Sequence, residues 1–163
     1  MVSRRLSREA GHRRKFLAIA DGTPESERAI AYAAYRAKAT NGALVLLHVI
    51  EPGDFQHWLG VEQIMREEAN AAASNALHAH AVNVRETVGI EPELVIREGT
   101  TKEEIHKLIE EDQDIAILVL AAGNNKEGPG PLVTSVAGKG AAFPIPVTVV
   151  PMGLSDEEIE SFT

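Results

Sequence analysis

The order in which apolar runs and helical segments alternate constrains this chain most. Five short runs consist almost entirely of apolar residues. Between them lie longer segments in which apolar residues recur at helical spacing. Strands that are covered on both faces have this composition. The alternation predicts an α/β fold: a single doubly wound, open sheet of five parallel strands with helices on both faces and right-handed crossovers. The strands are expected at 15–20, 43–50, 94–96, 115–122 and 144–151.

Local signals predict where the helices begin and end. Thr23 before Pro24 is typical of an N-cap followed by proline, and a helix is expected over 26–39. Gly42 is expected to end that helix in a left-handed conformation. Capping boxes are expected at Thr100–Glu103 or Thr101–Glu104, and at Ser155–Glu158. A long helix is expected over 61–88, with a buried stripe of Val61, Ile64, Met65, Ala69, Ala72, Ala76, Leu77 and, more weakly, Val84.

Composition excludes several classes of protein. The 163 residues include no cysteine, which excludes disulfides, thiolate metal sites and thiol catalysis. Aromatic residues make up only 4%, so the core is expected to consist of Ala, Val, Ile and Leu. No apolar run approaches the roughly 20 residues that cross a bilayer, and the N-terminus lacks the apolar segment of a secretory signal. A cytoplasmic protein without membrane contact is therefore expected.

Charge divides the chain into three parts. Residues 1–15 carry six Lys or Arg and one Glu, a net charge of +5, so that with a total of −8 the other residues carry −13. Residues 1–14 are expected to form a flexible basic arm, although contact with an anionic partner stays open. Residues 15–151 form the expected domain and 152–163 an acidic tail. An acidic body argues against nucleic-acid binding, because phosphate neutralisation supplies most non-specific affinity.

The sequence lacks the common motifs for catalysis and for metal binding. Neither a P-loop, G-x-x-x-x-G-K-[ST], nor a nucleophile elbow, G-x-S-x-G, occurs in it. His78 and His80 lie two residues apart on a helix and so face different ways, and the other histidines are scattered, so no metal site is expected. Since no nucleophile–base pair can be assigned, a protein without enzymatic activity is favoured.

One loop has the layout of a phosphate-binding turn. In VLAAGNNKEGPGPLVTS, residues 119–135, an apolar run leads into Gly, Asn and Pro, then into hydroxyls and a helical stretch. Glycines let a backbone approach phosphates, and a helix N-terminus favours their charge. Pro129 and Pro131, however, remove two N–H donors and stiffen the segment. The loop either holds a nucleotide or only connects a strand to a helix.

Two segments of the chain resemble a known family. FLAIADGTPESERAIAYAAYRAKATNGALVLLHVIEP resembles the first β-α-β unit of the universal stress protein family, and PIPVTVVP is similar to its last strand. The resemblance covers about residues 15–151. It implies an adenine nucleotide α-hydrolase-like fold with strand order 3-2-1-4-5. It also implies a homodimer joined through the edge at Val147, Thr148, Val149 and Val150.

The family's nucleotide-binding members carry G-x-x-G, nine residues, then G-[S/T]. An ungapped placement puts Ala121, Asn124 and Thr134 at the glycine positions and Ser135 at the hydroxyl position. Asn124 can adopt a left-handed conformation, but β-branched Thr134 would crowd a phosphate. The same loop carries other groups that could approach one, namely Gly123, Gly128, Gly130 and Lys126, although Lys126 is also typical of a solvated loop.

The resemblance further implies that Asp21 contacts a nucleoside and that Val49 lines the base pocket. Asp21 before Gly22 is equally typical of a turn, and Val49 of core packing. Two functions stay open. The first is a non-catalytic stress-response protein with a degenerate loop that acts through dimerisation and an unidentified protein partner. The second is a switch that binds ATP or AMP, with Mg²⁺ only alongside the nucleotide, and perhaps hydrolyses it slowly. The missing glycines favour the first.

Overall fold

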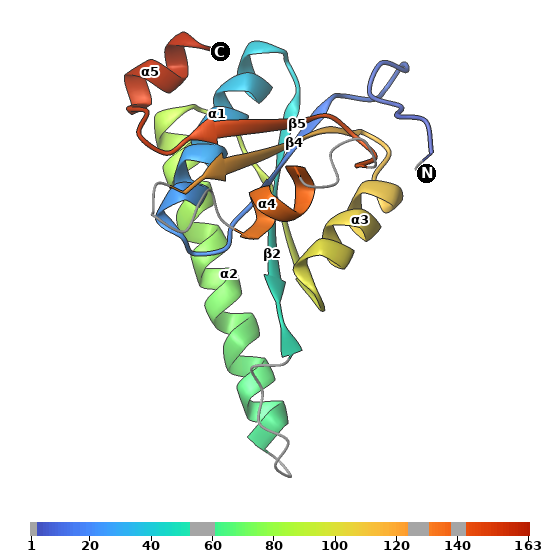
Figure 1. Ribbon diagram of the computed structural model, residues 1–163, viewed down its shortest axis with the longest axis vertical. Coiled ribbons are helices and arrows are strands. Elements are labelled where there is room, and N and C mark those ends of the chain that lie inside the picture. The colour runs from blue at the N-terminus through green and yellow to red at the C-terminus, as the bar shows by residue number, and fades with distance from the viewer. Residues whose placement is uncertain (1–2, 53–60, 124–130, 138–142) are drawn as a thin grey trace.

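A parallel sheet of five strands forms the centre of the molecule (Figure 1), in a computed structural model that describes residues 3–52, 61–123, 131–137 and 143–163. The strand order is β3-β2-β1-β4-β5, which confirms the predicted doubly wound α/β topology. The elements are β1 Lys15–Ile19, α1 Pro24–Ala39, β2 Ala43–Ile50, α2 Val61–Thr87, β3 Glu93–Glu98, α3 Thr101–Glu111, β4 Ile115–Ala122, α4 Pro131–Ala137, β5 Val147–Pro151 and α5 Asp156–Ser161.

Each face of the sheet packs against its own pair of helices. Side chains alternate along a strand, so Phe16 and Ala18 face α1 and α2, whereas Leu17 and Ile19 face α3 and α4. Alanines dominate the inner side of α1 and let that helix lie close to β1 and β4. None of the described helices is long and apolar enough to cross a bilayer.

The end of α1 differs from the prediction in which residue turns the chain. Asn41, with φ of 54°, adopts the left-handed conformation expected of Gly42. The Gly42 N–H donates to the Ala37 carbonyl at 2.7 Å and the Asn41 N–H to the Lys38 carbonyl at 3.2 Å, the two bonds of a Schellman motif. Gly42 is instead required because a Cβ there would collide with the Arg14 carbonyl oxygen.

The predicted buried stripe of α2 is only partly correct. Leu77 and Val84 are buried as expected, but Ala72 and Ala76 are exposed, and Ile64 is 56% exposed. The alanines that α2 buries are Ala73 and Ala81. The first turns of α2 project beyond the end of β2, so no strand lies beneath them to bury an apolar face (Figure 1). Helical periodicity identified the apolar side of the helix without revealing how much of its length the sheet covers.

Three further boundaries test the local signals. Ser155 and Glu158 form the predicted capping box of α5. At α3 the predicted box is wrong, because Thr100 is the N-cap without a side-chain bond. The N–H and hydroxyl of Thr101 donate instead to Glu51, at 3.3 and 3.0 Å. The last strand begins at Val147 rather than at 144, and β5 is an edge strand as expected.

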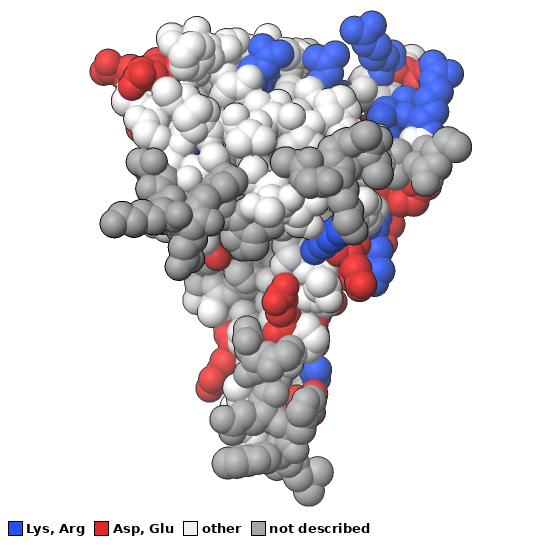
Figure 2. All heavy atoms as spheres, in the orientation of Figure 1, with Lys and Arg blue, Asp and Glu red and all other residues white. Residues whose placement is uncertain are grey.

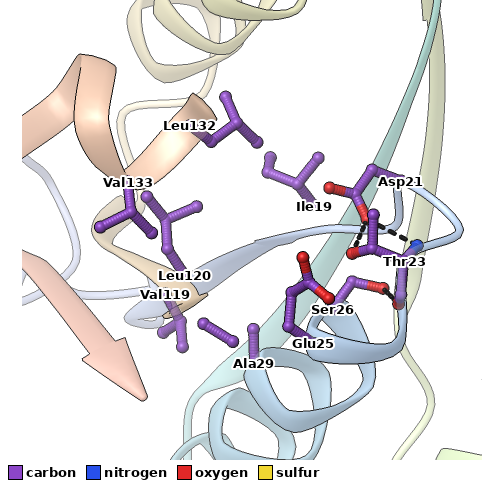
Figure 3. Close-up of a pocket in the computed structure, with 11 residues that line it drawn as sticks. Ile19, Asp21, Thr23, Glu25, Ser26, Ala29, Val119, Leu120, Leu132 and Val133 are labelled. Atoms are coloured by element: carbon purple, nitrogen blue, oxygen red, sulfur yellow. Dashed lines mark hydrogen bonds between the residues drawn. The ribbon is translucent and has the colours of Figure 1, made fainter. Parts of the chain in front are cut away.

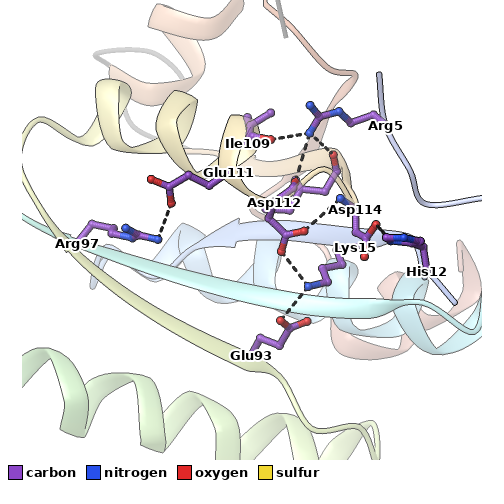
Figure 4. A network of polar contacts seen from close by, with 10 residues as sticks. Arg5, His12, Lys15, Glu93, Arg97, Ile109, Glu111, Asp112 and Asp114 are labelled. Carbon is purple, nitrogen blue, oxygen red and sulfur yellow. Dashed lines mark hydrogen bonds and ion pairs between the residues drawn. The ribbon is translucent and has the colours of Figure 1, made fainter. Parts of the chain in front are cut away.

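The N-terminal arm, residues 3–14, lies against the amino end of the sheet (Figure 4). The Arg5 guanidinium donates to the carbonyls of Ile109, Asp112 and Ile115, at 2.6, 3.3 and 3.3 Å. The Leu6 N–H donates to the Gln113 carbonyl at 2.9 Å. Basic side chains gather at this corner in Figure 2, while most of the acidic ones lie elsewhere on the visible face. The flexibility of the arm stays a prediction.

Candidate functional site

The carboxyl ends of β1, β2 and β4 leave two hollows, and ligands of open parallel sheets bind at such ends. The smaller, which we call the β1–β4 hollow, has a volume of about 80 Å³ and lies between the start of α1 and α4. The larger, which we call the β2–α2 groove, has a volume of about 630 Å³ and runs from β1 and β2 to the alanines of α2. Asp21 borders both.

The Asp21 carboxylate is bonded within its own turn (Figure 3). Its Oδ1 accepts from the Thr23 N–H at 3.0 Å and from the Thr23 hydroxyl at 2.6 Å. Gly22 has φ of +80°, which only glycine adopts readily, and Ser26 donates its hydroxyl to the Thr23 carbonyl at 2.7 Å. Thr23 is the N-cap of α1 and Pro24 is the first helical residue, as predicted. The Thr23 hydroxyl, however, donates to Asp21 and does not cap the helix. A nucleoside contact by Asp21 stays a prediction.

The β2–α2 groove has both Asp21 and Val49 in its lining, and Val49 also packs against the core on the α3 and α4 side of the sheet. A base pocket lined by Val49 stays a prediction. His48 beside them is held by a hydrogen bond of 2.7 Å between its Nδ1 and the Ala20 carbonyl, so this nitrogen carries the proton. The far wall consists of small side chains, at Ala69, Ala72, Ala73 and Ala76. Glu51, held by the first turn of α3, lies in the lining as well.

The residues of the predicted phosphate loop are only partly placed. Ala121 lies in β4, paired with Val150, and lines the β1–β4 hollow, and Gly123 follows directly after the strand. Thr134 is exposed and Ser135 half-buried on α4. The other predicted positions, Asn124, Lys126, Gly128 and Gly130, lie outside the described residues.

Apolar side chains of α4 line the β1–β4 hollow. Leu132 and Val133 line it from α4, with Leu120 of β4 beside Val133 and Ile19 of β1 across from Leu132 (Figure 3). Leu132 and Val133 were not among the residues predicted for a site. Their apolar spacing, directly after the loop and next to Thr134, is the signal that could have placed them at the strand ends.

Charge around the two hollows is negative. Their linings include the carboxylates of Asp21, Glu25 and Glu51, and neither lining includes a Lys or Arg among the described residues. Carboxylates repel phosphate at short range, and the repulsion grows as water is excluded. In the described part of the chain, no group of three or more His, Asp or Glu could hold a metal ion that would offset this charge.

Comparison with known proteins supports the architecture and the resemblance. The model of the universal stress protein family matches residues 12–151. UspA from Lactobacillus plantarum superposes with a TM-score of 0.70 at 19% identity, over 84% of this chain and 97% of that one. The hypothetical protein MJ0577 superposes with a TM-score of 0.68 at 25% identity, over 87% and 98%.

A third similar structure is a universal stress protein family member from Arabidopsis thaliana with AMP bound. It superposes with a TM-score of 0.58 at 20% identity, over 88% of this chain and 94% of that one. No curated protein sequence matches the chain significantly. Since the family model spans most of the residues and the sheet has the order that the resemblance implied, the chain belongs to the universal stress protein family.

Proposed function

We propose that this protein is a non-catalytic member of its family that acts as a homodimer through protein contacts, and that its nucleotide loop is degenerate. The observation that carries the proposal is the charge at the carboxyl end of the sheet. Three carboxylates and no described cation line the two hollows where a nucleotide would lie. A polyphosphate bound there needs amides or cations to offset its charge.

The residues at the loop's glycine positions support the same proposal. Ala121 and Thr134 add side chains where the family's nucleotide-binding pattern has none, and Thr134 is β-branched. The β1–β4 hollow beside them, about 80 Å³, is smaller than the roughly 300–1,000 Å³ of typical ligand pockets. Leu132 and Val133 line its α4 side with apolar groups, which have no hydrogen-bond donor or positive charge for a phosphate.

One observation favours a second function, an AMP- or ATP-binding switch. The β2–α2 groove, about 630 Å³, is large enough for a nucleoside and has Asp21 and Val49 in its lining. The relative from Arabidopsis thaliana is described with AMP bound. Under this alternative Asp21 would leave Thr23 to bond a ribose hydroxyl, and Lys126 or the loop amides would supply the phosphate contacts.

Calorimetric titration with ATP, ADP and AMP, with and without Mg²⁺, separates the two functions. The proposal expects no binding heat up to about 1 mM nucleotide, the limit of weak binding. Micromolar binding that Asp21→Ala abolishes and Glu157→Ala leaves intact would overturn it in favour of the switch. Glu157 is a suitable control because it is an exposed acid on α5, away from both hollows.

The dimer is tested at the edge of the sheet. Val149 on β5 is 43% exposed, and an uncovered apolar edge strand invites pairing with a second copy. Light scattering should give a dimer for the native chain and a monomer for Val149→Lys. The matched control is Val82→Lys, since Val82 on α2 is 45% exposed and far from β5 in the fold. A native monomer, or a dimer that survives in Val149→Lys, would contradict the proposal.

A further inference from the structure

We propose that a groove between α1, α2 and the start of α5, about 410 Å³ in volume, binds a small organic cation with an apolar body. The lining of this α1–α2 groove comes from α1, from α2 and the residue after it, and from Asp156 of α5. Neither β1 nor β4 contributes to it. The inference is independent of whether the carboxyl end of the sheet takes a nucleotide. It rests on the shape of the groove, its charge and the origin of one wall.

The floor of the groove is apolar and is formed by the core. Ile30, Val84 and Val88 are at most 3% exposed, and they line the groove between the two helices. Ala34 and Ala79 leave room where larger side chains would fill the gap. A volume of about 410 Å³ matches a small molecule, whereas a helix of a partner, about 10 Å across, needs a longer trough.

The rim carries more acid than base. Glu27 and Asp156 lie in the lining with one cation, Arg28. Arg28 is already engaged: its Nη1 lies 2.8 Å from Asp156 Oδ1 and donates to the Leu154 carbonyl at 3.1 Å. Its charge is therefore offset, while Glu27 makes no hydrogen bond or ion pair with any residue that the structure describes. A cation complements this rim better than an anion does.

Tyr35 also lines the groove and lies in the same negative electrostatic field. Burial raises the pKa of Tyr35, and the nearby carboxylates of Glu160 and Asp156 raise it further. The phenol therefore keeps its proton at neutral pH and offers a hydroxyl to a ligand. His80 and Asn83 supply further polar groups along α2. A few convergent polar groups over an apolar floor are typical of ligand sites.

One wall of the groove comes from outside the family's matched region. Asp156 opens α5, which begins after residue 151, where the family match ends. Helix α5 is anchored on α1 by the Arg28–Asp156 pair and by Ile159, which is fully buried (Figure 1). The groove is therefore completed by a segment that the shared domain does not supply.

Two probes with one apolar body and opposite charge test the proposal. Tryptamine and indole-3-propionate would be titrated separately into ¹⁵N-labelled full-length protein, with backbone amide shifts as the readout. We expect tryptamine to shift the amides of Ala31, Ala79 and Asn83 in a saturable way, and to bind about tenfold more tightly than the carboxylate. Equal or tighter binding of the carboxylate, no saturable binding of tryptamine, or shifts confined to other residues would each overturn the proposal.

Variants of lining residues distinguish binding in the α1–α2 groove from non-specific association. Ala79→Leu fills the groove and should abolish tryptamine binding. The control Ala71→Leu, at another exposed alanine of α2 that lines none of the three hollows, should not. Glu27→Gln should weaken binding about threefold, as loss of one exposed carboxylate does. Circular dichroism would confirm that each variant is folded. Unchanged affinity in both Ala79→Leu and Glu27→Gln would contradict the site.

Discussion

Charged residues make different contacts at the two ends of the sheet. At the amino end, the Lys15 Nζ lies between two carboxylates, 2.9 Å from Glu93 Oε1 and 2.8 Å from Asp112 Oδ2 (Figure 4). The His12 Nδ1 lies 2.7 Å from Asp114 Oδ1. At the carboxyl end, Asp21 bonds only to its own turn among the described residues, and two hollows open beside it.

From this difference we infer that the amino end of the sheet contributes mainly to stability, and the carboxyl end to binding. At the amino end, cations from the arm and β1 reach acids and carbonyls of β3, α3 and the turn before β4, so segments far apart in sequence are tied together. At the carboxyl end Glu51 accepts from Thr101, and Arg66 pairs with Glu98, but no ion pair joins the ends of β1 and β4 among the described residues. Side chains beside those two strand ends can therefore vary with less cost to the fold. Substitutions at the two ends should therefore differ in kind and in size.

The largest effect is expected for Lys15→Met. Removing the ammonium leaves Glu93 and Asp112 facing each other at a half-buried position, at a cost of about 2 kcal/mol in the free energy of unfolding. Arg85→Met removes a far more exposed pair with Glu91 and should cost less. Urea denaturation measures both. Equal losses would mean that the amino end contributes no more than an ordinary surface pair.

The Lys15 contacts also predict a pH dependence. Burial alone would lower the pKa of Lys15, but hydrogen bonds to Asp112 and Glu93 outweigh it, and the pKa is raised. The stabilisation is then present below the unfolded pKa of about 10.4 and is lost as pH rises through the folded value. The difference in stability between the native chain and Lys15→Met should shrink above that pH, which denaturation at pH 8 and pH 11 would show.

A smaller effect is expected for Arg5→Ala. The guanidinium donates to three carbonyls at the end of α3 and beyond it, and its loss should cost about 1–2 kcal/mol. Arg8→Ala is the control, since Arg8 is an exposed cation of the same arm. If the arm is flexible in solution, as its composition predicts, both variants will unfold at the native urea concentration. Heteronuclear relaxation of the arm amides would then confirm the mobility.

At the carboxyl end, Asp21→Ala is expected to cost less than about 1 kcal/mol, because the turn loses two local hydrogen bonds in an exposed place. Asp21→Asn keeps an oxygen in the same position and should be nearly neutral. Thermal unfolding of the pair measures the difference. A loss in Asp21→Asn as large as in Asp21→Ala would show that the charge matters and not the acceptor.

The smallest effect lies between the two ends, at His106 on α3. Burial, with Lys102 nearby, lowers the pKa of His106, so the unfolded chain takes up a proton more readily than the folded one. The resulting stabilisation is present above the unfolded pKa of about 6.5 and is lost as pH falls through the folded value. His106→Gln should flatten the stability profile between pH 7 and pH 5 by well under about 1 kcal/mol. A steeper profile in the variant would contradict the sign.

The fold was predictable because its signals are local. Apolar runs with both faces covered identified the strands, and capping residues placed the start of α1 and of α5 within two residues. The strand order came from the family resemblance, and the sheet has it. One error arose where a distant residue competed with a local partner, since Glu51 accepts from the Thr101 N–H that a capping box would have paired with Glu104.

The candidate site was predictable only in outline. Asp21 and Val49 line one groove, since the carboxyl ends of parallel strands share an edge, but their contact with a nucleotide stays a prediction. The bond between Asp21 and Thr23 is a local contact of the turn that Asp21 before Gly22 predicts. The part of Leu132 and Val133 in the β1–β4 hollow was not foreseen, because it depends on how close α4 lies to the strands.

By itself the sequence determined which segments are strands and helices, the parallel arrangement and the lack of thiol chemistry. These features depend on residue type and on spacing within one segment. Only the tertiary structure decided that Arg5 caps α3, that the first turns of α2 project from the sheet, and that α5 closes a groove between α1 and α2. Those outcomes depend on helix lengths and on packing between residues as many as 126 positions apart, which no local pattern encodes.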